Sequence, residues 1–223
     1  SPTVLVTRFE IVGATRWPAA TLRGLLADLE GQRLTAEALE RARRRVVRWY
    51  VEHGHLNSGA LLPDQRIVDG VVRIEVVEGR LDAIEVSGNR MLAERYLVER
   101  LRAAADVPLD VNRIHDRLQR LQELPTIERL QARFEPGDAR AAGRLHVHVT
   151  EASPWQAGLA VANNRAPSVG AIRTQVSGQH RSVSGRGDAL GLRYGLARGL
   201  DDWGVEYALP LRPDDLTLTV RAD

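Results

Sequence analysis

The sequence predicts an α+β protein in which two tandem β-α-α-β-β domains precede an antiparallel β-meander. The first observation is a duplication: Glu-Ile-Val-Gly at residues 10–13 returns as Glu-Val-Ser-Gly at residues 85–88, and the same displacement carries Leu34 to Leu109. A repeat of this length corresponds to one small domain. The second observation is that helical periodicity stops after Pro154, where apolar and polar residues alternate. The predicted domain boundaries are 1–79, 80–152 and 153–223.

The first repeat opens with a strand and a helix. Residues 4–12 are rich in β-branched side chains and stop at Gly13, where a turn needs the conformational freedom of glycine. Pro18 suits the first position of a helix, and leucines at helical spacing follow it. One stripe of this helix is therefore expected to pack against a sheet. The stripe consists of Leu22, Leu25, Leu26 and Leu29.

A second helix is predicted to begin after Thr35. The Thr35 hydroxyl can cap the first free N–H groups, and Glu37 favours the positive end of the helix dipole. Leu34 and Leu39 stand at the two positions of a hydrophobic staple. The second repeat keeps this arrangement around Asp110, so both repeats are expected to start this helix in the same way.

Two extended runs close each repeat, after the helices end near Gly54 and Pro125. Apolar and charged residues alternate in these runs, which is typical of strands with one buried face. The runs are residues 59–67 and 71–77 in the first repeat, and 127–134 and 144–150 in the second. Two amphipathic helices on one face of a three-stranded sheet make a complete two-layer domain.

The third segment contains four alternating runs and a fifth at residues 216–220. Strands of about ten residues with one apolar face are typical of a transmembrane β-barrel, although a soluble sandwich explains the alternation alone equally well. The residues expected on the apolar face are Trp155, Leu159, Val161, Ile172, Val176, Leu190, Leu192, Tyr194, Trp203, Val205, Tyr207 and Leu209, and those expected to line the opposite, wet face are Arg173, Gln175, Arg193 and Glu206. So few strands do not close a barrel. The apolar face is expected to meet lipid in the intact protein, and in this chain we expect the preceding domains, detergent or a second copy of the chain to cover it.

Composition limits the classes of function. The 223 residues include no cysteine, which excludes a disulfide framework and thiol chemistry. The formal net charge is only +2, and the chain has arginine but no lysine. We attribute this bias to a GC-rich genome rather than to a nucleic-acid-binding surface, and we expect no nucleic-acid partner. No apolar run is long enough for a transmembrane helix.

Candidates for catalysis or metal binding are weak. His146 and His148 lie on one face of a predicted strand, but no third ligand stands at a telling spacing, so we predict an exposed strand face. His53 and His55 flank Gly54 at a helix end, where an imidazole can meet the last carbonyl groups. We therefore predict a protein that is not an enzyme and has no catalytic, metal or cofactor site.

Three further features have both a functional and a structural interpretation. Arg-Gly-Asp at residues 186–188 suggests adhesion, but a tight turn explains it more simply. Trp17 and Trp49 are expected in the core, and an exposed groove for a client is the alternative. An arginine-rich helix face is expected to be solvated, with contact to an acidic partner or lipid headgroups as the alternative. This face comprises Arg41, Arg43, Arg44, Arg45 and Arg48.

Several short motifs are shared with one known family. In the first repeat they comprise Leu34, Thr35, Leu39, Tyr50, Gly54 and residues 60–70 and 76–79, and in the rest of the chain residues 86–90, 121–125, 134–137, 163–164 and Gly170. The most specific of them are Leu-Pro-x-Gln-x-Ile-x-Asp-Gly and Val-x-Glu-Gly. Through these residues the chain resembles the polypeptide-transport-associated (POTRA) domains and first barrel strands of two-partner secretion transporters, the haemolysin secretion/activation family. The family's plug helix, most of its barrel and its inward-folded loop have no counterpart in this sequence.

The resemblance implies the periplasmic and first-barrel part of an outer-membrane transporter in a Gram-negative bacterium. Such a transporter captures an unfolded exoprotein of the haemolysin or adhesin type and secretes it across the outer membrane, whose lipid surrounds the barrel. The nearest alternative is a general barrel-assembly factor of the same superfamily. The alternative from another class is a soluble periplasmic scaffold or chaperone. Self-association is a further expectation for the truncated chain.

The repeats can also bind a polypeptide through their main chains. An edge strand recruits an extended segment by hydrogen bonding, with little demand on the sequence of that segment. The more regular run 71–77 suits the centre of a sheet, which leaves the run 59–67 at the edge. The predicted contact residues are Leu61, Leu62, Arg66 and Ile67, and the corresponding edge of the second repeat is 127–134.

Overall fold

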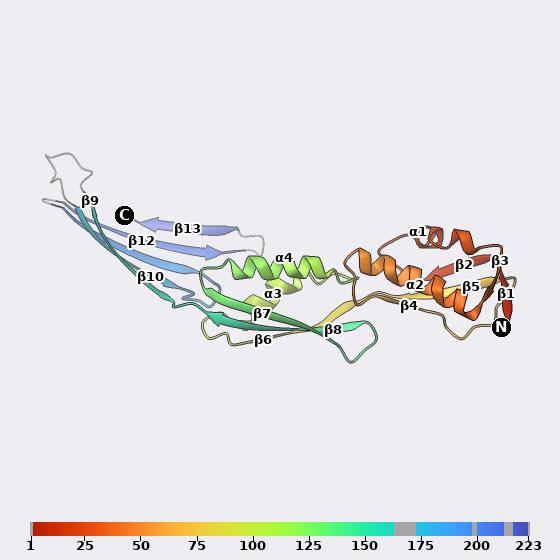
Figure 1. Ribbon diagram of the computed structural model, residues 1–223. Coiled ribbons are helices and arrows are strands. Elements are labelled where there is room, and N and C mark those ends of the chain that lie inside the picture. The colour runs from red at the N-terminus through yellow and green to blue at the C-terminus, as the bar shows by residue number, and fades with distance from the viewer. Residues whose placement is uncertain (1, 163–172, 198–199, 212–215, 223) are drawn as a thin grey trace. The chain divides into compact units, whose positions relative to one another are not determined.

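The computed structural model describes residues 2–162, 173–197, 200–211 and 216–222 (Figure 1). These residues form an α+β fold, as predicted. The chain divides into two compact units, and the elements of the second repeat pass from one unit to the other. The first unit comprises residues 1–85, 101–117 and 133–146, and the second comprises residues 86–100, 118–132 and 147–223.

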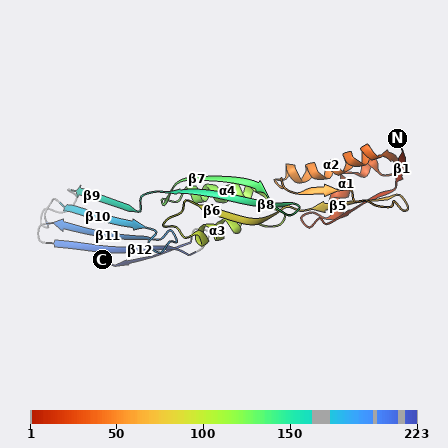
Figure 2. The ribbon, with the colours of Figure 1, turned by 90° about the horizontal axis from the view of Figure 1, so that it is seen from below.

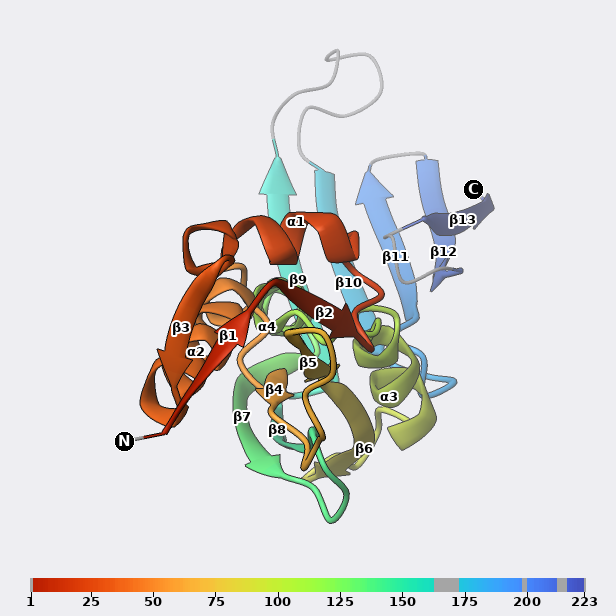
Figure 3. The same cartoon turned by 90° about the vertical axis from the view of Figure 1, so that its right-hand side faces the viewer.

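The first repeat contains a three-stranded sheet and a helical layer. Its elements are β1 (Thr3–Val6), β2 (Arg8–Val12), α1 (Ala19–Gly24), the 3₁₀ helix η1 (Ala27–Leu29), β3 (Gln32–Thr35), α2 (Ala36–Glu52), β4 (Gly59–Leu61) and β5 (Val71–Val77). In the sheet, β5 lies between the parallel strand β2 and the antiparallel strand β4. A separate ribbon pairs β1 with β3, and Figure 3 shows these two strands side by side.

The first extended run is two strands, which corrects the expectation of one strand over residues 4–12. The break falls at Thr7, whose N–H donates to Gly70 O at 2.8 Å and whose hydroxyl donates to Asp69 O at 2.6 Å. These bonds hold Thr7 against the turn before β5. As a result, β2 joins the main sheet next to β5, while β1 pairs with β3 in the separate ribbon.

The predicted first helix is also interrupted. The helix α1 ends at Gly24, a residue of low helix propensity, and η1 continues the helical layer. Its stripe faces the sheet as expected, although unevenly, because two of the four leucines are only partly buried. Leu22 and Leu26 are buried in the core, and Leu25 and Leu29 pack against it.

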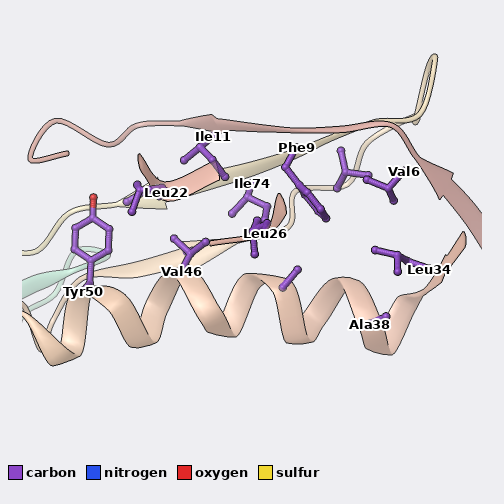
Figure 4. Close-up of a cluster of buried hydrophobic side chains, with 14 residues drawn as sticks. Val6, Phe9, Ile11, Leu22, Leu26, Leu34, Ala38, Val46, Tyr50 and Ile74 are labelled. Carbon is purple, nitrogen blue, oxygen red and sulfur yellow. The ribbon is translucent and has the colours of Figure 1, made fainter. Parts of the chain in front are cut away.

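The long helix α2 begins where the sequence predicts. The Thr35 hydroxyl accepts a hydrogen bond from Ala38 N at 3.2 Å, which caps the helix. One face of α2 then enters the core of the first repeat through Ala38, Ala42, Val46 and Tyr50. Figure 4 shows this face opposite Phe9, Ile11 and Ile74 of the sheet, with Leu22 and Leu26 between the two layers.

The second repeat has the same order of main elements as the first, strand, two helices and two strands, and its last two strands are longer. Its elements are β6 (Arg80–Ser87), α3 (Glu94–Arg102), α4 (Val111–Gln122), β7 (Ile127–Pro136) and β8 (Ala142–Glu151). The strand order is β6-β8-β7, so β7 is an edge strand. Asp110 accepts a hydrogen bond from Asn112 N at 2.9 Å just before α4, as the predicted cap requires.

The two repeats share the glycine after their first main strand. Gly13 has a φ of +83° and Gly88 a φ of +80°, in the left-handed region that favours glycine. A side chain at Gly13 would overlap the carbonyl oxygen of Val76, and one at Gly88 would overlap that of Val149. The turn and its close approach to the last strand therefore require glycine at both positions.

A glutamate at the end of the last strand holds the loop after each of these glycines. The carboxylate of Glu78 accepts hydrogen bonds from the N–H groups of Thr15 and Arg16 at 2.9 Å and from the Tyr50 hydroxyl at 2.8 Å. Glu151 does the same in the second repeat. It accepts from the N–H groups of Arg90, Met91 and Leu92 at 2.8–3.0 Å.

The third segment forms an antiparallel sheet of five strands. They are β9 (Trp155–Ala162), β10 (Arg173–Arg181), β11 (Ala189–Ala197), β12 (Leu200–Pro210) and β13 (Thr217–Ala222), in the order β13-β12-β11-β10-β9. Figure 2 shows β9 to β12 side by side. Asn163, Asn164, Gly170 and Ile172, which carry expectations for the first hairpin and the apolar face, lie outside the described residues. Among the helices that are described, none is long and apolar enough to span a membrane.

Candidate polypeptide-binding edges and an apolar sheet face

The strand β4 is the edge strand of the first repeat, and β5 is its centre. The strand is only three residues long, and its Leu61 pairs with Glu75. Of the four predicted contact residues, only Leu61 belongs to it. Leu62, Arg66 and Ile67 follow in a segment without strand structure. Pro63 has no N–H to donate, which helps to explain why the strand ends before it.

A glutamine side chain continues the ladder where β4 ends. Arg73 N on β5 donates to Gln65 Oε1 at 2.7 Å, and Gln65 Nε2 donates to Arg73 O at 2.8 Å. Main-chain groups two residues apart face the same edge of a strand, so Arg73 faces the same edge as Glu75, which β4 pairs. The amide of Gln65 thus takes the place of a neighbouring strand there.

An arginine of α2 occupies the outer side of β4. Arg43 Nη1 donates to Ala60 O at 2.9 Å, and the same guanidinium forms an ion pair with Glu40. Arg45, from the same arginine-rich face, forms an ion pair with Asp28. These two members of the face therefore have structural partners, and the short edge of the first repeat is partly occupied.

The strand β7 offers a longer edge in the second repeat. It covers ten residues, and most of them between Glu128 and Phe134 are exposed. Gln122, the last residue of α4, bonds to it through both ends of its amide. Leu130 N donates to Gln122 Oε1 at 2.7 Å, and Gln122 Nε2 donates to Glu128 O at 3.2 Å.

The five-stranded sheet exposes one apolar face. Trp155 is 72% exposed, Leu159 73% and Leu192 54%, values far outside the range of a packed core. The exposed members of the predicted face are Trp155, Leu159, Val161, Val176, Leu192, Tyr194 and Trp203, while Leu190, Val205, Tyr207 and Leu209 are partly exposed. An apolar surface of this extent on a sheet is typical of contact with lipid or with another molecule.

The opposite face of this sheet is polar. Arg173 and Asp202 form an ion pair across the strands, and Arg221 pairs with Glu206 at 2.7 Å. These residues alternate with the apolar ones along each strand, and therefore lie on the other side of the sheet. One apolar and one charged face is the pattern of a transmembrane strand that separates lipid from water.

The histidine pair of β8 lies among protein partners. His146 contacts the carboxylates of Glu85 at 3.1 Å and Glu135 at 3.3 Å, and His148 shares a hydrogen bond with Ser87 at 3.0 Å. The described residues include no cluster of His, Cys, Asp and Glu that could hold a metal ion. The two histidines thus interact with separate neighbours.

The aromatic residues at the end of α2 pack together. Trp17 lies edge-on to Tyr50 with ring centroids 4.9 Å apart and to Trp49 at 6.0 Å. His53 Nδ1 lies 2.7 Å from Trp49 O, as predicted for an imidazole at the carbonyl end of a helix. His55 is buried, with Nδ1 2.9 Å from Leu109 O. Both tryptophans are partly buried against the core of the first repeat.

The Arg-Gly-Asp sequence forms a turn, and its aspartate is inaccessible. Asp188 is fully buried, and its carboxylate accepts hydrogen bonds from Ser184 N and from the Tyr207 hydroxyl, both at 2.9 Å. Gly187 has a φ of +71°, which suits a tight turn. An adhesion motif needs its carboxylate free to bind a partner, so the structural interpretation of this turn is the correct one.

Comparisons with known proteins agree with this architecture. Residues 4–79 match the family described as POTRA domain, ShlB-type. The chain is 28% identical over 205 residues to the outer membrane transporter CdiB of Escherichia coli O6:K15:H31 (strain 536 / UPEC), covering 92% of this chain and 32% of that protein. It thus spans about a third of the length of the Escherichia coli CdiB proteins that it matches.

Two solved structures share the architecture of this chain. CdiB from Escherichia coli matches with a TM-score of 0.69 and 23% identity, over 94% of this chain and 40% of that chain. BamA from Haemophilus ducreyi, lacking POTRA domains 1–3, matches with a TM-score of 0.58 and 16% identity, over 97% of this chain and 42% of that chain. At these identities the structural matches establish the fold.

Proposed function

We propose that this chain, which is a homologue of the CdiB outer membrane transporters and begins with a ShlB-type POTRA domain, is the periplasmic and first-barrel part of a two-partner secretion transporter. The observation that carries the proposal is the five-stranded sheet, with its exposed apolar face, directly after two repeats of POTRA type. The domain boundaries that we propose are 1–79 and 80–152 for the POTRA domains and 153–223 for the barrel segment.

In this proposal, the POTRA domains bind an exoprotein in extended form by strand addition. The cargo of a transporter has to stay unfolded, and main-chain pairing accepts many sequences. The candidate edges are β4, with Leu61 and the following residues Leu62, Arg66 and Ile67, and β7. The cargo then passes to the pore that the complete barrel forms, and neither step requires a cofactor or a catalytic residue.

The apolar sheet face supports an outer-membrane location for the third segment, with the POTRA domains in the periplasm. A soluble scaffold needs Leu192 and Tyr194 inside a closed core, whereas both are exposed. The general barrel-assembly factor is less favoured, because the curated relatives that match are CdiB transporters, whereas BamA shares the fold at low identity.

Liposome flotation tests the membrane part of the proposal. The chain is diluted from detergent into liposomes of outer-membrane lipids, and we expect it to float with them. Leu192→Arg should greatly reduce flotation, because an arginine on a lipid-facing strand costs about 2–4 kcal/mol near the bilayer midplane.

Arg193→Glu is the matched control, because residue 193 is next in the strand and lies on the opposite face. It should float like the unaltered chain. Equal flotation of the Leu192 and Arg193 variants would count against lipid contact at the predicted face.

A further inference from the structure

The two candidate edges differ in how much main chain they offer. The outer side of β4 is three residues long, and its Ala60 O already accepts from Arg43. Beyond it, Gln65 covers Arg73 of β5. An incoming strand along β4 would therefore have to displace Arg43 to gain a ladder of three residues, and Gln65 closes the part of β5 that lies beyond it.

The strand β7 has one side chain on its edge. Leu130 N donates to Gln122 Oε1 at 2.7 Å, and a single N–H does not also donate to β8 at that distance. Leu130 therefore faces away from the rest of the sheet. Because alternate residues face the same edge, Glu128 and Ala132 face outward as well. The amide of Gln122 spans Glu128 O and Leu130 N as a strand would.

Gln122 is well placed to move away. It is exposed, it is the last residue of α4, and it holds β7 through two neutral hydrogen bonds, which water or another peptide can replace at modest cost. When it leaves, the outward main-chain groups of Glu128, Leu130 and Ala132 become one continuous ladder.

We infer that Gln122 is a displaceable latch on the edge of β7, and that an extended polypeptide binds at residues 128–132 by taking the place of its amide. The inference rests on the proposed function, since it names the edge where strand addition occurs. With the latch closed, the edge is protected against indiscriminate pairing, a hazard that natural edge strands limit with side chains. With the latch displaced, the cargo gains the full ladder.

Peptide binding measured by fluorescence anisotropy tests the latch. The probe is a short fluorescein-labelled peptide of alternating threonine and valine, added to the full chain in detergent. We expect Gln122→Ala to bind it about fivefold more tightly, because the peptide no longer competes with two hydrogen bonds. Amide hydrogen exchange at Leu130 should also become faster without the peptide. Gln119→Ala, at an exposed glutamine of the same helix, should change neither quantity.

Two controls separate the latch from strand addition itself. The same peptide with N-methyl groups on alternate residues has lost main-chain donors, so it should bind weakly to every variant. Ala132→Pro removes a donor from the edge of β7 and should weaken binding, with circular dichroism to confirm the fold.

Tighter binding to Gln122→Ala, together with weak binding of the methylated peptide, supports the inference. Equal affinity for Gln122→Ala and the unaltered chain overturns the latch, but leaves strand addition standing if the methylated peptide still fails to bind. Strand addition at this edge, and the latch with it, is contradicted if neither methylation of the peptide nor Ala132→Pro changes the affinity. It is also contradicted if no variant binds the peptide.

Discussion

The turn after the first main strand depends on one glycine in each repeat. At Gly13 and Gly88 the backbone is left-handed and runs against a carbonyl of the last strand, so two separate constraints fall on the same residue. The sequence predicts glycine freedom at Gly13 from its position after a strand. The close approach to Val76 is a tertiary contact, and no local pattern reveals it.

Gly13→Ala should destabilise the chain by about 2 kcal/mol, because alanine is strained at this φ and its methyl group would overlap Val76 O. Gly24→Ala is the control. Apart from the helix backbone and the two adjacent residues, nothing lies within 4 Å of a Cβ added there, and alanine favours the helix, so stability should stay equal or rise by up to about 1 kcal/mol. Urea unfolding followed by circular dichroism measures both. Equal loss in the two variants would contradict the assigned role of Gly13.

Glu78 ties the end of β5 to the loop after Gly13. Burial raises the pKa of its carboxyl, but hydrogen bonds from Thr15, from the main chain of Arg16 and from Tyr50 outweigh burial, so the pKa lies below its ordinary value. A folded-state pKa below the unfolded one adds stability above the unfolded pKa, which is about 4.3 for glutamate, and this stability is lost as pH falls through the folded value.

Glu78→Gln should cost about 1–2 kcal/mol at neutral pH, since a neutral amide accepts these hydrogen bonds less strongly. The difference from the unaltered chain should shrink as the pH falls below about 4. Glu75→Gln, on the exposed side of β5, should change stability by less than about 0.5 kcal/mol. The pH dependence of urea unfolding measures all three chains. A loss from Glu78→Gln that stays constant across this pH range would contradict the electrostatic account.

At the level of elements, the sequence predicts those helices and strands whose positions depend on neighbouring residues. The start of α2 follows from Thr35, and the strand β5 follows from its alternation, because both depend on residues within a few positions of each other. The β1–β3 ribbon was missed because it depends on the contact of Thr7 with Gly70. The sequence does not predict that Gln65 and Gln122 bond to the sheet edges, because hydrogen bonding between an amide side chain and a strand leaves no periodic pattern in the sequence.

The cap of α2 gives a prediction for a single element. Thr35→Ala should cost about 1 kcal/mol of stability, because Ala38 N loses its acceptor. Thr21→Ala, at an exposed position inside α1, should cost less than about 0.5 kcal/mol. Thermal unfolding of both variants and of the unaltered chain in detergent measures these losses of stability. An equal loss of stability would mean that the Thr35 hydroxyl does not act as the cap.

At the scale of the whole molecule, the exposed apolar face of the five-stranded sheet is expected to govern how the chain behaves in solution. The alternation of the sequence predicted its residues, from Trp155 to Trp203, but alternation alone left a soluble sandwich equally open. The exposure of these residues in the structure decides against a closed core. Capture of cargo at β4 or β7 remains a prediction, because it depends on a partner.

Without detergent or lipid, the exposed face should drive association between copies of the chain. Light scattering should therefore show oligomers in detergent-free buffer and a smaller species once detergent is added. The Leu192→Arg and Arg193→Glu variants give a matched pair, and the first should associate less than the second. A monodisperse monomer without detergent would favour the soluble scaffold.

One face of this sheet is expected to meet lipid while the other meets water, and site-specific quenching tests this arrangement most directly. The chain has no cysteine, so Leu192→Cys and Arg193→Cys each accept a single fluorescent label. In liposomes, nitroxide groups on lipid tails should quench the label at 192 strongly and the label at 193 weakly, and aqueous iodide should show the reverse order. Equal quenching at both positions by either agent, or the opposite order, would contradict the account.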